Sequence, residues 1–243
     1  MNATRIDVKI REAVVRRANR LNFGKVYKLL ENRPFILAGG ALSGDAVHDF
    51  DVYPDAERPF TLDDVLDARR AADNIEVSLV AHTRNAVTLL LPAGQTVQFC
   101  AYRKPTLKAL VDSFDFSHVQ VGVRFRGDGQ PPQPQDVYYT DEFMLANITR
   151  QSTYTHSEYP TSSIVRTLKY YKRGKMARSS AARSVLRAMA DVIQRGFKDY
   201  ADFKDQLDAI DLGMPDCTEA RLLWEAVRGA KLVANPTVTE HAE

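Results

Sequence analysis

The sequence predicts an α+β protein in which a sheet of mixed or antiparallel strands comes first and a group of helices follows. Segments rich in β-branched and aromatic residues are concentrated between residues 34 and 125, whereas helical periodicity dominates from residue 141 onward. The chain has 243 residues and 44% of them are hydrophobic, which is ample for a packed core. We therefore expect a sheet domain with N-terminal helices over residues 1–135, a helical domain over 136–235 and a disordered tail over 236–243.

The individual elements follow from periodicity, capping and turn residues along the chain. Apolar residues recur at helical spacing in the first thirty residues, and Asp63 and Asp64 fall in the first turn of the helix that Thr61 opens. The Gly- and Pro-rich segment 127–135 forbids regular structure, so it marks either the edge of the sheet domain or a surface loop within it. The expected strands are 34–40, 48–54, 75–81, 86–92, 96–102 and 118–125, of which the third to fifth should be antiparallel neighbours, and the expected later helices are 61–73, 106–113, 141–149, 162–173, 179–196, 199–210 and 217–233.

Charge is balanced over the whole chain but not along it. The 33 basic and 31 acidic residues leave a net charge of +2, yet ten basic residues occur from Arg166 to Lys198, where Asp191 is the one acidic residue and Asp199 follows directly. Such a segment favours an anionic partner. No run of 18 apolar residues occurs and the N-terminus alternates charged with apolar residues, so we expect no membrane span and no signal peptide. A cytoplasmic protein with reduced thiols at Cys100 and Cys217 is expected.

Two aspartates two residues apart carry the clearest chemical signal. In the strand expected at 48–54, Asp49 and Asp51 project to one face while Phe50 and Val52 turn toward the core. Two carboxylates on one face repel each other unless a cation lies between them. Mg²⁺ suits this arrangement, because it takes one or two carboxylates together with phosphate oxygens and water. Asp49 and Asp51 are therefore candidate metal ligands.

A glycine turn precedes this strand. Gly39 and Gly40 lie between the strand at 34–40 and a short helix expected from Ala41, where backbone N–H groups can hold phosphate. The hydroxyl of Ser43 could add a contact. An Asp-x-Asp is common on surfaces and a Gly-Gly is usually a plain turn, so neither motif identifies a site alone.

Together, the strand, the Gly-Gly turn, about nine residues and the Asp-x-Asp strand resemble the signature of the polymerase-β-like nucleotidyltransferase superfamily, especially its tRNA nucleotidyltransferase-type branch. The resemblance covers approximately residues 33–126. Within it, TVQFCAYRKP falls where such enzymes have their next core strand, and SFDFSHVQVGV is similar to the Asp-Phe-Thr-x-Asn-Ala segment of that branch.

The resemblance implies transfer of a nucleoside monophosphate from an NTP such as ATP to an acceptor hydroxyl, with Mg²⁺ and loss of pyrophosphate. Two departures qualify it. Active members usually carry a third carboxylate on the core strand, where this chain has Gln98, so either Asp115 or Asp112 completes the site, metal binding is weakened, or the domain is inactive. Ala41 and Leu42 stand where the branch has an arginine, which weakens the case for CCA addition specifically. We take Asp49, Asp51 and Asp115 as the expected catalytic residues.

The basic segment adds candidate nucleotide contacts. In these enzymes a helical domain after the catalytic one commonly helps to hold NTP and acceptor, and this implies triphosphate or RNA contacts by Arg166, Lys169, Lys172 and Arg173. Tyr170 and Tyr171 could stack on bases. The alternative is a solvated amphipathic helix. The expected partners are an NTP and, through the basic helices 162–198, an RNA end.

Three functions remain open from the sequence. The first is addition of nucleotides to an RNA end, as by a tRNA-like branch member. The second keeps the chemistry but modifies a protein or small molecule, as some toxins of the superfamily do. The third is a non-catalytic binding module that has kept the fold and lost the metal site. Gln98 in place of a third carboxylate suggests this possibility.

Overall fold

A computed structural model of the chain describes residues 3–44, 49–71, 77–92 and 94–208. Several expectations fall outside these ranges. They are the start of the strand at 48–54, the end of the helix at 61–73, the start of the strand at 75–81, the end of the helix at 199–210, the helix at 217–233 and the tail at 236–243.

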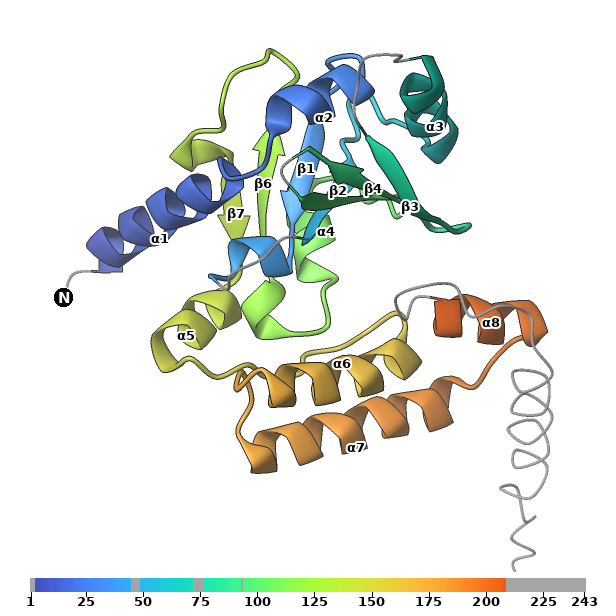
Figure 1. Cartoon of the computed structure of the whole chain (residues 1–243). Coiled ribbons are helices and arrows are strands. Elements are labelled where there is room, and N and C mark those ends of the chain that lie inside the picture. Colours follow the sequence, from blue (N-terminus) through green and yellow to red (C-terminus); the bar gives the residue numbers. More distant parts are fainter. Residues whose placement is uncertain (1–2, 45–48, 72–76, 93, 209–243) are drawn as a thin grey trace, which may run out of the picture.

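Seven strands of the described residues form one mixed sheet (Figure 1), which confirms the expected sheet type and adds one strand to the six expected. Their order across the sheet is β3-β4-β5-β2-β1-β6-β7. Strands β3, β4 and β5 are antiparallel neighbours, which confirms the expected meander, whereas β2 runs parallel to β5. The strands are β1 (Phe35–Ala38), β2 (Asp49–Pro54), β3 (Ser78–His82), β4 (Ala86–Leu91), β5 (Gln95–Cys100), β6 (Val121–Phe125) and β7 (Val137–Tyr139).

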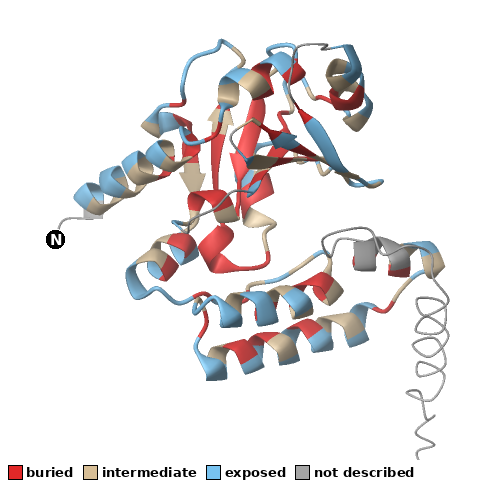
Figure 2. Ribbon diagram, in the orientation of Figure 1, coloured by how far each residue is buried: buried red, intermediate tan, exposed pale blue. Residues whose placement is uncertain are grey.

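Helices cover the sheet unequally. The main hydrophobic core lies between one sheet face and α1, α2 and α3, and α4 covers only the part of the other face near β1 and β6 (Figures 1 and 2). The helices are α1 (Ala3–Ala18), α2 (Phe23–Leu29), α3 (Leu62–Ala71), α4 (Leu107–Asp112), α5 (Asp141–Thr149), α6 (Pro160–Lys172), α7 (Arg178–Arg195) and α8 (Tyr200–Asp208), with short 3₁₀ turns η1 (Gly40–Leu42), η2 (Ser117–Val119) and η3 (Pro134–Asp136).

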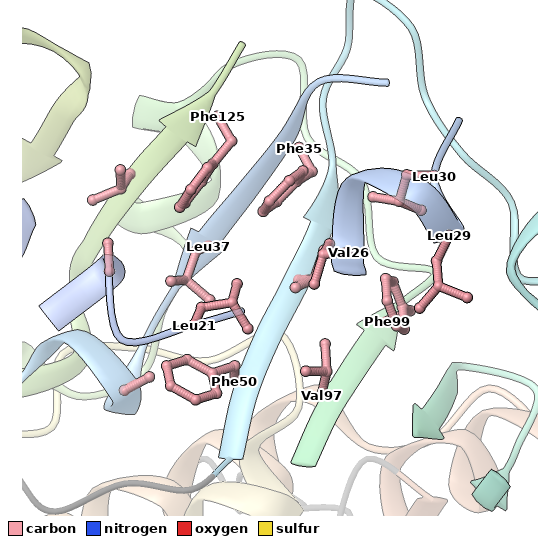
Figure 3. Close-up of a cluster of buried hydrophobic side chains, with 14 of the residues drawn as sticks. Leu21, Val26, Leu29, Leu30, Phe35, Leu37, Phe50, Val97, Phe99 and Phe125 are labelled. Atoms are coloured by element: carbon pink, nitrogen blue, oxygen red, sulfur yellow. The ribbon is translucent and has the colours of Figure 1, made fainter. Parts of the chain in front are cut away.

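Aromatic side chains fill the centre of the main core (Figure 3). Phe35 on β1 and Phe125 on β6 stack with ring centroids 4.5 Å apart and an interplanar angle of 9°. Phe50 and Phe99 lie on the neighbouring strands and are also buried. Buried aromatic rings on the core face of the sheet therefore hold the strands beside the candidate site in place.

Three boundaries differ from the sequence-based expectation. The N-terminal helical region is broken at residues 19–22, where Asn22 caps α2 by accepting a hydrogen bond from Lys25 N. His118 lies in η2 and not in a strand, because β6 begins at Val121. Segment 127–133 is a loop between β6 and β7, and residues 134 and 135 begin η3, although no regular structure is expected there. The sheet thus continues to Tyr139, past the boundary expected at residue 135.

The helical part follows the sheet and contacts it through side chains. Helix α6 lies between α7 and the sheet (Figure 1). The Glu158 carboxylate, just before α6, accepts hydrogen bonds from Tyr102 Oη at 2.7 Å and Lys104 Nζ at 2.5 Å. No helix in the described part of the chain is both long and apolar enough to cross a bilayer.

Asp64 in α3 gives a prediction about acid stability. A hydrogen bond from Arg33 and another from Thr61 N lower its pKa from the ordinary value of 3.8 to about 2. Its ionised form is therefore favoured by folding, so this stabilisation is complete above pH 4 and is lost as the pH falls through about 2. The side chain is 35% exposed, so we expect a contribution of about 1 kcal/mol or less.

Urea denaturation between pH 5 and pH 2 checks this expectation. The free energy of unfolding of the Asp64→Asn variant should fall less steeply over that range than the free energy of the wild-type protein. Asp67→Asn, a change on the same helix at a residue that is 71% exposed, is the matched control. Parallel curves for Asp64→Asn and wild type would contradict the prediction.

Candidate active site

Strand β2 presents its acidic side chains on the open part of the sheet. Phe50 and Val52 are buried in the core, so Asp49, Asp51 and Tyr53 project to the opposite face. Asp49 is exposed and Asp51 is partly buried. The structure thus places both aspartates on one side of one strand, in the centre of the sheet between β1 and β5.

The glycine turn lies directly beside Asp51. Gly39 follows β1 with φ 88° and ψ −145°, a conformation essentially restricted to glycine. Its N–H donates to Val121 O at 3.0 Å, which ties the turn to β6. A Cβ atom at Gly39 would lie 3.6 Å from Asp51 Oδ2. The absence of a side chain therefore leaves the aspartate accessible from the turn.

The turn continues into η1, whose conformation is fixed by two contacts. Ser43 Oγ donates to Gly40 O at 2.9 Å, and Arg17 Nη1 on α1 donates to Leu42 O at 2.7 Å. The Ser43 hydroxyl thus closes the turn, and its oxygen retains acceptor capacity. The short helix expected from Ala41 is this 3₁₀ turn.

Gly39→Ala tests the turn. We expect the alanine variant to lose about 1–3 kcal/mol in the free energy of unfolding, because a non-glycine residue is strained at this φ and ψ. Gly40→Ala is the control, since a Cβ there meets nothing within 4 Å and φ is ordinary, so its change should stay within about 0.5 kcal/mol. Thermal or chemical denaturation measures both, and equal stabilities would contradict the prediction.

Gln98, which stands where a third carboxylate is expected, is neutral. Gln98 on β5 pairs in register with Asp51, and its Nε2 atom donates to Thr88 Oγ1 on β4 at 3.4 Å. The amide supplies no charge. Two carboxylates with one amide suit a single Mg²⁺ that also binds phosphate oxygens and water, but they do not match a set of three acids.

Asp115, the expected third acid, is bonded to two side chains of α6 in the structure. The carboxylate is buried, and its Oδ2 atom accepts hydrogen bonds from Ser163 Oγ at 2.7 Å and from Arg166 Nη1 at 3.0 Å on α6. Within the described ranges, no group of three or more His, Cys, Asp and Glu side chains is arranged to hold a metal ion. A long-range ion pair of this kind leaves no trace in local sequence.

Arg166 lies between this buried carboxylate and the open sheet face. Burial opposes its charge, but Asp115 outweighs that effect and raises the pKa of the guanidinium. The same positive charge opposes the rise in the pKa of Tyr53 and of Cys100, in which burial is the largest cause. Arg166 is thus held by Asp115, and its charge acts on one residue of β2 and one of β5.

Tyr53 and Cys100 are neighbours of the site that the motif does not reveal. Tyr53 lies on β2 and Cys100 ends β5, where its Sγ atom donates to Gln98 O at 3.9 Å. Burial, and then the Asp51 charge, raise the pKa of the Cys100 thiol well above its ordinary value, so it stays protonated and is a poor metal ligand. Strand alternation could have located both, since Tyr53 follows Asp51 by two residues and Cys100 follows Gln98 by two.

The remaining expected cations lie farther out on α6. Lys169 and Lys172 are exposed, as is Arg173 at the end of the helix. Tyr170 packs inward, with its ring 4.2 Å from that of His118, whereas Tyr171 is 40% exposed. Of the two tyrosines, only Tyr171 is therefore placed to meet a ligand at the outer surface.

Comparison with known proteins gives one family and a set of similar folds. A model of the family described as Gabija anti-defense 2 family protein matches residues 11–150, which is more than half of the chain. No curated protein matches the sequence.

Solved structures of CCA-adding enzymes resemble the fold. One in complex with CTP has a TM-score of 0.51 and 14% identity, and the match covers 95% of this chain and 57% of that one. An apo form has a TM-score of 0.47 and 16% identity, covering 85% and 51%. The chain thus spans a little over half the length of these structures. At such identities the likeness shows the fold alone.

Proposed function

Since the chain belongs to the Gabija anti-defense 2 family, we propose that this family member is a Mg²⁺-dependent nucleotidyltransferase that moves a nucleoside monophosphate from an NTP to an acceptor hydroxyl. The observation that carries the proposal is the placement of Asp49 and Asp51 on one face of β2, with Gly39 close enough that its missing side chain would meet Asp51. The similarity of the fold to CCA-adding enzymes supports it.

The donor set supports one metal-binding role for the aspartates. Asp49 and Asp51 would hold Mg²⁺, which supplies charge neutralisation at the reacting phosphate and activation of the attacking oxygen. Gly39, Gly40 and Ser43 would contact the phosphates through the turn that follows β1. The neutral Gln98 leaves the site with fewer charges than a three-acid site, so we expect weak Mg²⁺ binding in the absence of nucleotide.

The cations of α6 would serve the triphosphate and the acceptor. Arg166 has four guanidinium N–H groups beyond the one that binds Asp115, and its position beside the sheet face suits a phosphate contact. Lys169, Lys172 and Arg173 lie nearer the surface and suit either the outer phosphates or an acceptor.

Observations favour two classes of acceptor for the nucleotide, and one observation favours a binding module without catalysis. An RNA end is favoured by the exposed cations of α6 and α7, together with Tyr171. A protein or small-molecule acceptor is favoured by the family description, because an anti-defense role can be met by modifying a defence component. Gln98 in place of an acid is the observation that favours a binding module without catalysis.

Incubation with each α-labelled NTP and Mg²⁺, with total RNA or total protein as acceptor, tests the proposal. Label should appear on one class of acceptor and should require Mg²⁺. Transfer to RNA selects the first acceptor and transfer to protein the second. The matched control is the Asp51→Asn variant in the same reactions. No label with any NTP and either acceptor, from a folded protein, would contradict the proposed chemistry.

A further inference from the structure

The open face of the sheet continues from the two aspartates of β2 to the edge strand β3. Residues that pair across neighbouring strands lie on one face of a sheet, so the strand register extends this face across β5, β4 and β3. The paired residues beyond Asp49 and Asp51, which we call the β3–β5 platform, are Thr96, Gln98, Thr88, Leu90, Ser78 and Ala81. At about 4.8 Å per strand, the platform reaches about 14 Å from β2.

The β3–β5 platform is accessible to a ligand. On β4, Leu89 and Leu91 are buried in the main core, whereas Leu90 between them is 39% exposed. On β5, Val97 and Phe99 are fully buried, and the platform residues that alternate with them are partly exposed. The edge strand β3 is exposed over most of its length (Figure 2). Every second side chain therefore faces away from the core and can contact another molecule.

The platform carries no positive charge. The chain has 33 lysine and arginine residues, but the four strands β2, β3, β4 and β5 contain none of them. Their acidic residues are Asp49 and Asp51, while His82 on β3 pairs with Val87, which faces the core. Arg84 lies in the turn between β3 and β4, beyond the platform. Proteins hold nucleic acids mainly through lysine and arginine contacts to phosphates, so this surface lacks the groups that an RNA strand requires.

The cations of α6 lie toward the other end of the site. The positive charge of Arg166 opposes the rise in the pKa of Tyr53 and of Cys100. These two residues follow Asp51 and Gln98 by two positions on their strands. A triphosphate supplies the anion that such a cation binds. Because phosphoryl transfer places the attacking and leaving oxygens in line, an acceptor reaches the α-phosphorus from the side away from the leaving pyrophosphate. The β3–β5 platform is the sheet surface available on that side.

We propose that the β3–β5 platform receives a protein acceptor, and that the hydroxyl group belongs to a serine, threonine or tyrosine side chain of that protein. The inference rests on the proposed function and names the acceptor class. Thr88, Thr96 and Gln98 offer hydroxyl and amide groups to a peptide backbone, and Leu90 offers an apolar contact. The acceptor oxygen bonds to the α-phosphorus, the bond from that phosphorus to the oxygen of the β-phosphate breaks, the hydroxyl proton passes to solvent, and pyrophosphate leaves.

Total cell protein and total RNA, each incubated with the full chain, α-labelled NTP and Mg²⁺, test the inference. Label should appear on protein, resist ribonuclease and be released by protease. The Leu90→Lys variant should raise several-fold the protein concentration for half-maximal transfer, because a cation replaces an apolar contact, and should leave the KM for NTP unchanged. Leu90→Ser removes the apolar contact without adding charge and should act in the same direction if Leu90→Lys folds poorly.

Salt dependence gives a second criterion. At saturating NTP, the protein concentration for half-maximal transfer should change little between 50 and 200 mM salt. An RNA held by six or more phosphate contacts would instead lose about 10³-fold or more in affinity over that range.

The matched control changes an exposed leucine on another surface. Leu145 on α5 is 61% exposed, and Leu145→Lys should leave both the protein and the NTP dependence unchanged. Circular dichroism establishes that each variant is folded. Label on RNA alone, or transfer to protein that neither Leu90 variant alters, would overturn the inference and leave the proposed nucleotidyl transfer standing. No label on either acceptor would contradict the proposed function, and the inference with it.

Discussion

Replacing Asp51 with asparagine should reduce nucleotide transfer by about 10³-fold, the scale on which a large electrostatic contribution to catalysis is lost. Asparagine keeps the shape of the side chain and removes one of only two charges on the site face of β2. Because Gln98 already occupies the neighbouring register position, no third acid compensates in the described structure. Asp49→Asn should act in the same direction.

Transfer of label from the preferred NTP, measured as turnover at saturating Mg²⁺ and nucleotide, gives the size of the loss. Asp67→Asn on α3 makes the identical chemical change at an exposed residue and should retain full activity. Circular dichroism must show that the Asp51→Asn variant is folded. Wild-type turnover in that variant would remove the aspartate pair from the mechanism, and with it the basis of the proposed function.

Replacing Asp115 with alanine should reduce the free energy of unfolding by about 2–3 kcal/mol, because a buried carboxylate loses its hydrogen bonds from Ser163 and Arg166. The Arg166 side chain is 38% exposed, so solvent screens the charge that is left without its carboxylate. Asp115→Asn should cost less, since an amide oxygen can still accept the hydrogen bond from Ser163. Asp67→Ala breaks an exposed pair with Arg70 and should cost about 1 kcal/mol or less.

Chemical denaturation measures these changes, and the Mg²⁺ dependence of transfer gives an independent criterion. If Asp115 holds Arg166, then Asp115→Asn should leave the Mg²⁺ concentration for half-maximal activity unchanged while raising the KM for NTP. A several-fold increase in the Mg²⁺ requirement would instead return Asp115 to the role of third acid that the sequence suggested.

Local patterns predicted the features that depend on neighbouring residues. The alternation in HDFDVYP placed Asp49 and Asp51 on one side of β2, and the glycines after PFILA predicted the turn at Gly39. The three-strand meander also followed from short turns between β-rich segments. These features are decided within a few residues, so their signals survive in the sequence alone.

Features that depend on contacts between distant residues could not be predicted from the sequence. β7 has only three residues and is recognisable as a strand only through its pairing with β6 across a Pro-rich loop. The ion pair of Asp115 with Arg166 joins residues 51 apart. The sequence suggests Asp115 as a site acid because it precedes a strand in a segment similar to a nucleotidyltransferase motif. Its bonds to Ser163 and Arg166 depend on where α6 packs, and local sequence does not show this.

The Gly39 turn is completed by a strand that is synthesised much later. Gly39 N–H binds Val121 O, and β1 lies between β2 and β6, so the surroundings of Asp51 require a residue 70 positions farther along the chain. At 5–20 residues per second, a ribosome takes roughly 4–14 s to cover that distance. A growing chain therefore carries its two aspartates for seconds before the turn beside them can be held in place. Truncated chains that end before β6 should contain the Asp-x-Asp motif but not an assembled site.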